Sequence, residues 1–191
     1  MKRTVHACQY LLLCWVLPFF IGLALSQVAW AGDASLYDLP LKWTDDHGQT
    51  VGMEQWRGKA VLMSMGYTSC RKTCSVTLKK LEEFQAVLDQ KKQDVEVVIV
   101  SFDPRNDTPE SWAAYRKQHG LNRGNWHFLS GSERDTRRLS QFLGLSDFWS
   151  LEGHILHDFK ISVLGKSGQI AQQIDWQDLK KPDLLTRLGT S

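Results

Sequence analysis

Cys70 and Cys74 are the residues of this chain whose type and spacing carry the most chemistry. They follow an apolar run at 60–67, at the point where a strand should give way to a helix. Side chains four residues apart on a helix share one face at about 5–6 Å, and a disulfide tolerates a Cα separation of roughly 4.4–6.8 Å. A helix N-terminus favours the thiolate, and Arg71 and Lys72 add positive charge. The pair could therefore form a reversible disulfide or bind one soft metal ion.

A third ligand would decide between these two roles. Soft sulfur selects Cu(I), and imidazole suits copper in both oxidation states. His154 and His157 precede an expected strand at 160–164, which should lie beside the first central strand and bring its entry loop near the cysteines. The residues alone leave both histidines open. The other histidines of the domain occupy a turn, a helix end and a strand start, as ordinary surface or packing residues do: His47, His119 and His127.

Three other uses of the cysteine pair are weighed against metal binding. A purely structural disulfide across so short a loop would remove little entropy from the unfolded chain. A thiol-disulfide oxidoreductase of the thioredoxin type needs a cis-proline before the strand at 160–164, where this chain has none, and usually two residues between its cysteines. A peroxide-reducing thiol enzyme needs a different arrangement around one cysteine. Metal binding is therefore the favoured interpretation, and the oxidoreductase is the alternative.

The N-terminal segment at 1–31 has the pattern of a secretory signal. It begins with two basic side chains, continues with an apolar stretch at 11–25, and ends with Ala29-Trp30-Ala31, which suits a signal peptidase. An uncleaved membrane anchor is the alternative, because the apolar part is just long enough to span a bilayer. We therefore expect export to the periplasm or the outer face of the inner membrane, with membrane association possible through this segment. Residues 32–191 form the working domain.

Charge and cysteine content narrow the function further. Outside 1–31 the chain carries 21 basic and 21 acidic residues, which argues against a nucleic-acid partner. Its size predicts one domain with an adequate core. Cys8 and Cys14 lie in the signal segment, so the domain keeps one cysteine pair, too few for a disulfide framework. Export to an oxidising compartment then favours a redox or metal role for that pair.

Hydrophobic periodicity predicts the elements that position the pair. Continuous apolar runs indicate two buried parallel strands at 59–66 and 95–102. The remaining pattern predicts an N-terminal hairpin, three further strands and four helices: 41–51; 126–129, 160–164 and 169–174; 77–88, 109–119, 133–143 and 178–188. This order predicts a three-layer α/β domain around a central mixed sheet. With a cysteine pair at the first strand-to-helix junction, a thioredoxin-like fold fits.

Two segments resemble a known family. The loop Gly66-Tyr67-Thr68-Ser69-Cys70-Arg71-Lys72-Thr73-Cys74 is similar to the Gly-Tyr/Phe-Thr-x-Cys-x-x-x-Cys loop of the Sco/SenC family of copper chaperones. The segment at 101–110 is similar to that family's Ser-x-Asp-Pro-x-x-Asp-Thr-Pro. The turn at 45–48 and Arg57-Gly58-Lys59 also match the start of the family. The resemblance covers about 36–173.

The resemblance implies a function and a ligand set. Cys70 and Cys74 would be thiolate ligands of a copper ion, as Cu(I) or Cu(II), and the family's spacing back from Gly168 selects His157 as the imidazole ligand. Asp103 would be an acidic residue beside the ligands or at a docking surface. Such proteins assist the copper centre of cytochrome c oxidase, by copper transfer or by reducing target thiols. The expected partner is the copper-bearing oxidase subunit or another copper or thiol protein.

Overall fold

The computed structural model describes residues 34–70, 73–145, 149–151 and 154–181. The chain divides into two units, 1–33 and 34–191, and all that follows concerns the second. The predicted signal segment lies outside the described residues, as does most of the helix expected at 178–188. None of the helices in the described part is long and apolar enough to cross a bilayer.

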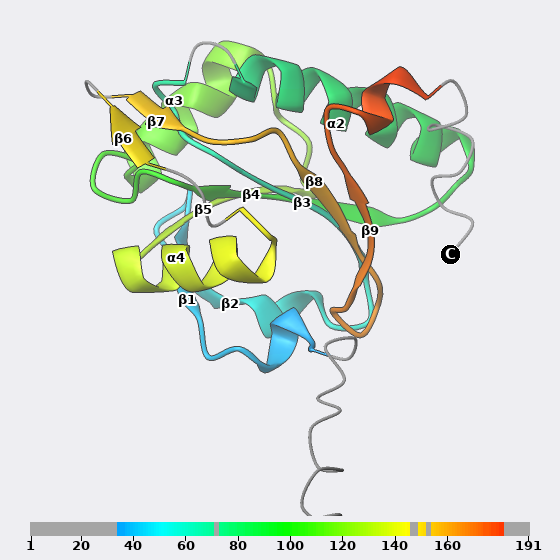
Figure 1. Cartoon of the computed structure of the whole chain (residues 1–191), viewed down its shortest axis with the longest axis horizontal. Coiled ribbons are helices and arrows are strands. Elements are labelled where there is room, and N and C mark those ends of the chain that lie inside the picture. Colours follow the sequence, from blue (N-terminus) through cyan, green and yellow to red (C-terminus); the bar gives the residue numbers. More distant parts are fainter. Residues whose placement is uncertain (1–33, 71–72, 146–148, 152–153, 182–191) are drawn as a thin grey trace, which may run out of the picture. The chain divides into compact units, whose positions relative to one another are not determined.

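A mixed seven-stranded sheet forms the centre of this unit, in the order β2-β1-β5-β4-β3-β8-β9 (Figure 1). The three strands β5, β4 and β3 are mutually parallel, and every other neighbouring pair is antiparallel. The strand bounds are β1 (Lys42–Asp45), β2 (Thr50–Gly52), β3 (Ala60–Gly66), β4 (Val95–Ser101), β5 (Trp126–Gly131), β8 (Ile161–Leu164) and β9 (Ile170–Ile174). The predicted parallel pair and the N-terminal hairpin are confirmed.

Helices cover both faces of the sheet, as the three-layer prediction requires (Figure 1). On one face lie α2 (Thr73–Gln90) and α3 (Pro109–His119). On the other lie α4 (Glu133–Phe142) and two 3-10 turns, η1 (Leu36–Asp38) and η2 (Met53–Trp56). Each face has its own buried cluster of apolar side chains.

The central strand β3 shows why both faces of the sheet must be covered. Val61, Met63 and Met65 enter the cluster on the α4 face, whereas Leu62 enters the cluster on the α2 face. Because successive side chains point to opposite faces, a strand that is apolar throughout needs a layer on each side. Both methionines are almost fully buried, so they fill the core.

Three features differ from the sequence prediction. The helix after β3 begins at Thr73 rather than at residue 77, which places Cys74 in its first turn. A small two-stranded hairpin, β6 (Trp149–Leu151) and β7 (His154–Leu156), was not expected; it is separate from the main sheet. At the C-terminal end of the described residues, only the short turn η3 (Asp178–Lys180) belongs to the expected last helix.

Candidate metal centre

The topology of the sheet brings two segments that are far apart in the sequence to the same edge of the sheet. The cysteines follow the C-terminal end of β3 at Gly66. Since β8 runs antiparallel to β3, the residues that enter β8 arrive at that same edge. Ile161 pairs with Ser64, and the Ser64 hydroxyl donates to the Lys160 carbonyl at 2.8 Å. His157, just before β8, therefore lies beside the cysteine loop.

The three predicted ligands converge. The sulfurs of Cys70 and Cys74 and one ring nitrogen of His157 all lie within 4.8 Å of one another. Both cysteines are reduced, and the Cys74 amide donates to the Cys70 sulfur at 3.4 Å. Metal bonds to such donors are about 2.0–2.3 Å long, so an ion among them needs only small inward movements. No other group of this kind occurs within the residues that the structure describes.

Backbone and ring contacts fix the orientation of His157. Its Nδ1–H donates to the Asp158 carbonyl at 2.9 Å, while Nε2 is buried and has no hydrogen-bond partner among the described residues. The ring packs on Phe102, with centroids 4.5 Å apart, and edge-on to Tyr67, at 6.0 Å. A carbonyl on one nitrogen commonly orients a metal-binding histidine and leaves the other nitrogen for the ion. Nε2 is thus the ligand atom that this geometry makes available.

The two sulfurs do not titrate independently. A hydrogen bond to Cys70, followed by burial and the negative charge of Cys70, raises the pKa of the Cys74 thiol far above its usual value. Cys74 is 5% exposed, whereas Cys70 is half-buried. Charging both sulfurs in this setting requires a cation to replace the proton. Cys74 therefore keeps its proton until a metal ion or an oxidant displaces it.

Gly66 leaves the space that Cys74 occupies. A Cβ atom at this position would lie 3.2 Å from the Cys74 sulfur and 3.8 Å from a methyl of Ile99. The first distance is tighter than ordinary van der Waals contact, so any larger residue would displace the sulfur or the strand. The glycine of the predicted motif is therefore explained by packing against the ligand.

The acidic contact expected of Asp103 is made instead by Asp107. The buried Asp107 carboxylate accepts hydrogen bonds from the Thr68 amide at 3.1 Å and hydroxyl at 2.6 Å, and from the Ser101 hydroxyl at 2.5 Å. Asp103 accepts from the Asn106 side chain. Both acids belong to the segment at 101–110, but only the folded loops show which one faces the cysteine loop.

Three other histidines of the domain stand apart from this site. His127 pairs with Glu96 at 2.7 Å, and His119 stacks on Tyr115 with centroids 4.3 Å apart. His47 lies exposed in the turn between β1 and β2. His154 belongs to β7, but its side chain lies outside the described residues. Sequence reasoning assigned no role to Tyr67 and Phe102, although both are in the motifs that it singled out.

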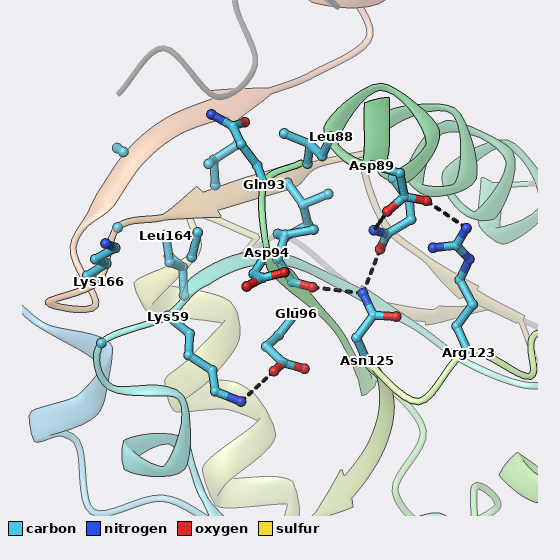
Figure 2. Close-up of a pocket in the computed structure, with 18 residues that line it drawn as sticks. Lys59, Leu88, Asp89, Gln93, Asp94, Glu96, Arg123, Asn125, Leu164 and Lys166 are labelled. Atoms are coloured by element: carbon cyan, nitrogen blue, oxygen red, sulfur yellow. Dashed lines mark hydrogen bonds and ion pairs between the residues drawn. The ribbon is translucent and has the colours of Figure 1, made fainter. Parts of the chain in front are cut away.

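A cavity of about 1130 Å³ lies at the opposite edge of the sheet (Figure 2). It begins where β3 and β4 begin, at Ala60 and Val95. Charged side chains around it pair with one another: Lys59 with Glu96 at 2.5 Å, and Arg123 with Asp89 at 2.7 Å. None of the three candidate ligands lines it, so it does not contribute to the metal centre.

Comparison with known proteins agrees with this geometry. The family model described as SCO1/SenC matches residues 31–188. The chain belongs to the SCO1/SenC family. A curated relative, the SCO1 protein homolog of Bacillus subtilis, is 25% identical over 134 residues, which is 69% of each chain.

Solved structures show the same fold. A copper-bound ScoI of Arabidopsis thaliana superposes with a TM-score of 0.64 at 19% identity, covering 72% of this chain and 87% of that one. BsSco, described as a Sco-family cytochrome c oxidase assembly protein with a disulfide switch, gives 0.62 at 20% identity, covering 74% and 88%. The predicted thioredoxin-like α/β fold is confirmed.

Proposed function

We propose that this SCO1/SenC protein is a copper-binding chaperone that takes its ion through Cys70, Cys74 and His157. The observation that carries the proposal is the convergence of two reduced sulfurs and one ring nitrogen of His157 within 4.8 Å. Two thiolates and an imidazole form a soft donor set that suits copper in both oxidation states. The copper-bound Arabidopsis relative supports the choice of metal.

Each ligand has a distinct part in holding the cargo. Two thiolates are sufficient for Cu(I), whose soft character matches sulfur. His157 adds a harder donor that favours Cu(II), and the Asp158 carbonyl keeps its Nδ1–H turned away from the ion. Binding must release protons from the sulfurs, because only thiolates ligate. Cys70, at the more exposed side, is where a partner thiol would make its first contact.

The cellular role follows from the family and the signal-like segment. We place the protein outside the cytoplasm, in the periplasm or at the outer face of the inner membrane, where residues 1–31 would direct it. The proposed target is the copper-bearing subunit of cytochrome c oxidase, served by copper transfer or by reduction of its thiols. The description of BsSco as a member of a cytochrome c oxidase assembly family supports this target.

Thiol-disulfide exchange is the second candidate function. Cys70 and Cys74 are reduced, close and hydrogen-bonded, so they can close into a disulfide. In that reaction the pair loses two electrons and two protons, and a disulfide of a target protein gains them to become two thiols. The disulfide switch described for BsSco favours keeping this alternative.

Replacing His157 by alanine tests the ligand assignment. We expect the reduced wild-type domain to bind one copper ion and, as the Cu(II) form, to show thiolate-to-copper charge-transfer absorption. His157→Ala should remove most of that absorption and leave Cu(I) binding less affected, since both sulfurs remain. The matched control is His47→Ala, an exposed turn histidine whose loss should change neither.

Two results would contradict the proposal. If His154→Ala abolishes the Cu(II) form while His157→Ala does not, the imidazole ligand is misassigned. If replacement of Cys70 and Cys74 by serine leaves copper binding intact, the metal centre is elsewhere, and thiol exchange becomes the leading function.

A further inference from the structure

The β6–β7 hairpin precedes the histidine ligand and needs outside support. Each of its strands has three residues, and it does not join the main sheet. An isolated two-stranded hairpin is marginally stable in water. His157 follows β7 directly. The position of the imidazole therefore depends on whatever holds β7 in place.

The Tyr67 hydroxyl contacts the middle of β7 through two hydrogen bonds. It donates to the Ile155 carbonyl at 3.1 Å and accepts from the Ile155 amide at 3.3 Å. In an antiparallel pair, every second residue turns its N–H and C=O away from the partner strand. Ile155, opposite Ser150, presents both groups to Tyr67, so the phenol takes the place of a neighbouring strand.

Tyr67 also belongs to the cysteine loop. Its carbonyl accepts a hydrogen bond from the Cys70 amide at 3.1 Å, and its ring meets the His157 ring edge-on. The residue is 4% exposed. One side chain thus links the segment of the two sulfurs to the segment of the imidazole.

We propose that Tyr67 is a positioning residue that fixes the distance between the cysteine loop and His157 by holding β7 through its hydroxyl. The inference rests on the proposed copper function. Removing the hydroxyl should let β7 and the imidazole move relative to the cysteine loop. Residues that orient a metal ligand typically change metal affinity by about 10–100-fold when they are replaced.

Tyr67→Phe removes the hydroxyl and keeps the ring. Tyr37→Phe is the matched control: Tyr37 is buried, and its hydroxyl has no hydrogen-bond partner among the described residues. Hydrogen exchange of the Ile155 amide in the reduced, metal-free protein reports the contact directly. We expect a protected amide in the wild type and exchange at least about tenfold faster in Tyr67→Phe, since local opening sets the rate.

Copper binding provides the second readout. We expect Tyr67→Phe to weaken Cu(II) affinity by about tenfold or more and to reduce the nitrogen coupling in the Cu(II) electron paramagnetic resonance spectrum. Cu(I) affinity should change by less than about threefold, because sulfur dominates that complex. Tyr37→Phe should match the wild type in all three measurements.

Several outcomes would overturn the inference. They are a rapidly exchanging Ile155 amide in the wild type, unchanged exchange and Cu(II) affinity in Tyr67→Phe, or equal losses of Cu(I) and Cu(II), which would place the effect on the cysteines. Failure of the copper function itself looks different: the wild type binds no copper, while Ile155 exchange still responds to Tyr67→Phe.

Discussion

The proton on the Cys74 thiol governs the chemistry of the site. The raised pKa of Cys74 means that its thiol stays protonated at neutral pH. The hydrogen bond to Cys70, followed by burial, causes this shift. A metal ion removes this constraint because it binds the sulfurs as thiolates and so takes the place of the proton. Copper uptake is then coupled to proton release.

Proton release can be measured at this scale. We expect Cu(I) added to the reduced domain at pH 7 in weak buffer to release at least about one proton per ion bound, followed with a pH indicator. Cys74→Ser should release fewer, since serine does not ionise in this range. Stoichiometric Cu(I) binding without proton release would show that both sulfurs are already ionised and that Cys74 holds no proton.

Gly66 offers a second test at residue scale. Gly66→Ala places a methyl group 3.2 Å from the Cys74 sulfur, and overpacking of this kind costs about 1–3 kcal/mol. We expect lower unfolding free energy in urea and weaker Cu(I) binding. Gly124→Ala is the control, because a Cβ there meets nothing within 4 Å. Identical copper affinity in Gly66→Ala and Gly124→Ala would mean that the sulfur position is not critical.

At the scale of elements, Asp107 joins the loop after β3 to the loop after β4. Its carboxylate receives three donors, two from Thr68 and one from Ser101. Asp107 directly precedes Thr108, which is the N-cap of α3. The Thr108 side chain accepts a hydrogen bond from the Ser111 amide. Asp107 therefore anchors the cysteine loop to the start of α3, the helix that follows the neighbouring strand β4.

Removing the Asp107 carboxylate should loosen this anchor. Asp107→Ala leaves buried donors unpaired, at a cost of about 1–3 kcal/mol in unfolding free energy. Asp103→Ala, at the exposed part of the same loop, should cost much less. Chemical denaturation of both variants measures the difference. Equal costs would show that Asp107 is not the residue that connects the loops.

The same carboxyl predicts a pH dependence. Burial, which outweighs the hydrogen bonds from Ser101 and Thr68, raises the pKa of Asp107 above 3.8. The folded state then holds this proton more tightly than the unfolded state, so the stability from this group is greatest below pH 3.8 and falls as pH rises through the raised pKa. The unfolding free energy of the wild type relative to Asp107→Asn should decline across that window; a rise would reverse the sign of the shift.

Sequence periodicity was sufficient to predict the elements whose own residues show a clear hydrophobic pattern. Continuous apolar runs gave β3 and β4, and helical spacing of Leu78, Leu81 and Phe84 gave α2. The hairpin β6–β7 lacks such a signal, because three-residue strands have no measurable period and depend on a tertiary contact to Tyr67. For the site, residue types and spacing nominated Cys70 and Cys74, and the family resemblance selected His157 over His154. Asp107 and the aromatic contacts required the folded loops.

For the whole molecule, copper should act as a stabilising ligand. An ion that binds the folded state and not the unfolded one adds about 2.7 kcal/mol at 100 times its dissociation constant, which raises Tm by about 5–10 °C in a domain of this size. Differential scanning calorimetry of the reduced domain, with and without Cu(I), measures the shift. A chelator should reverse it. An unchanged Tm at saturating Cu(I) would mean that the ion binds folded and unfolded chains alike.

The sulfurs and the imidazole belong to segments far apart along the polypeptide, and this separation has an entropic consequence. A cross-link restricts the unfolded chain according to the loop it closes, by about 4–5 kcal/mol for roughly 90 residues and about 2 kcal/mol for roughly five. An ion between Cys70 and His157 closes the long loop, whereas a Cys70–Cys74 disulfide closes the short one. Oxidation thus replaces a long-range cross-link by a local one, and we expect proteases to degrade the oxidised, metal-free form before the copper-bound form.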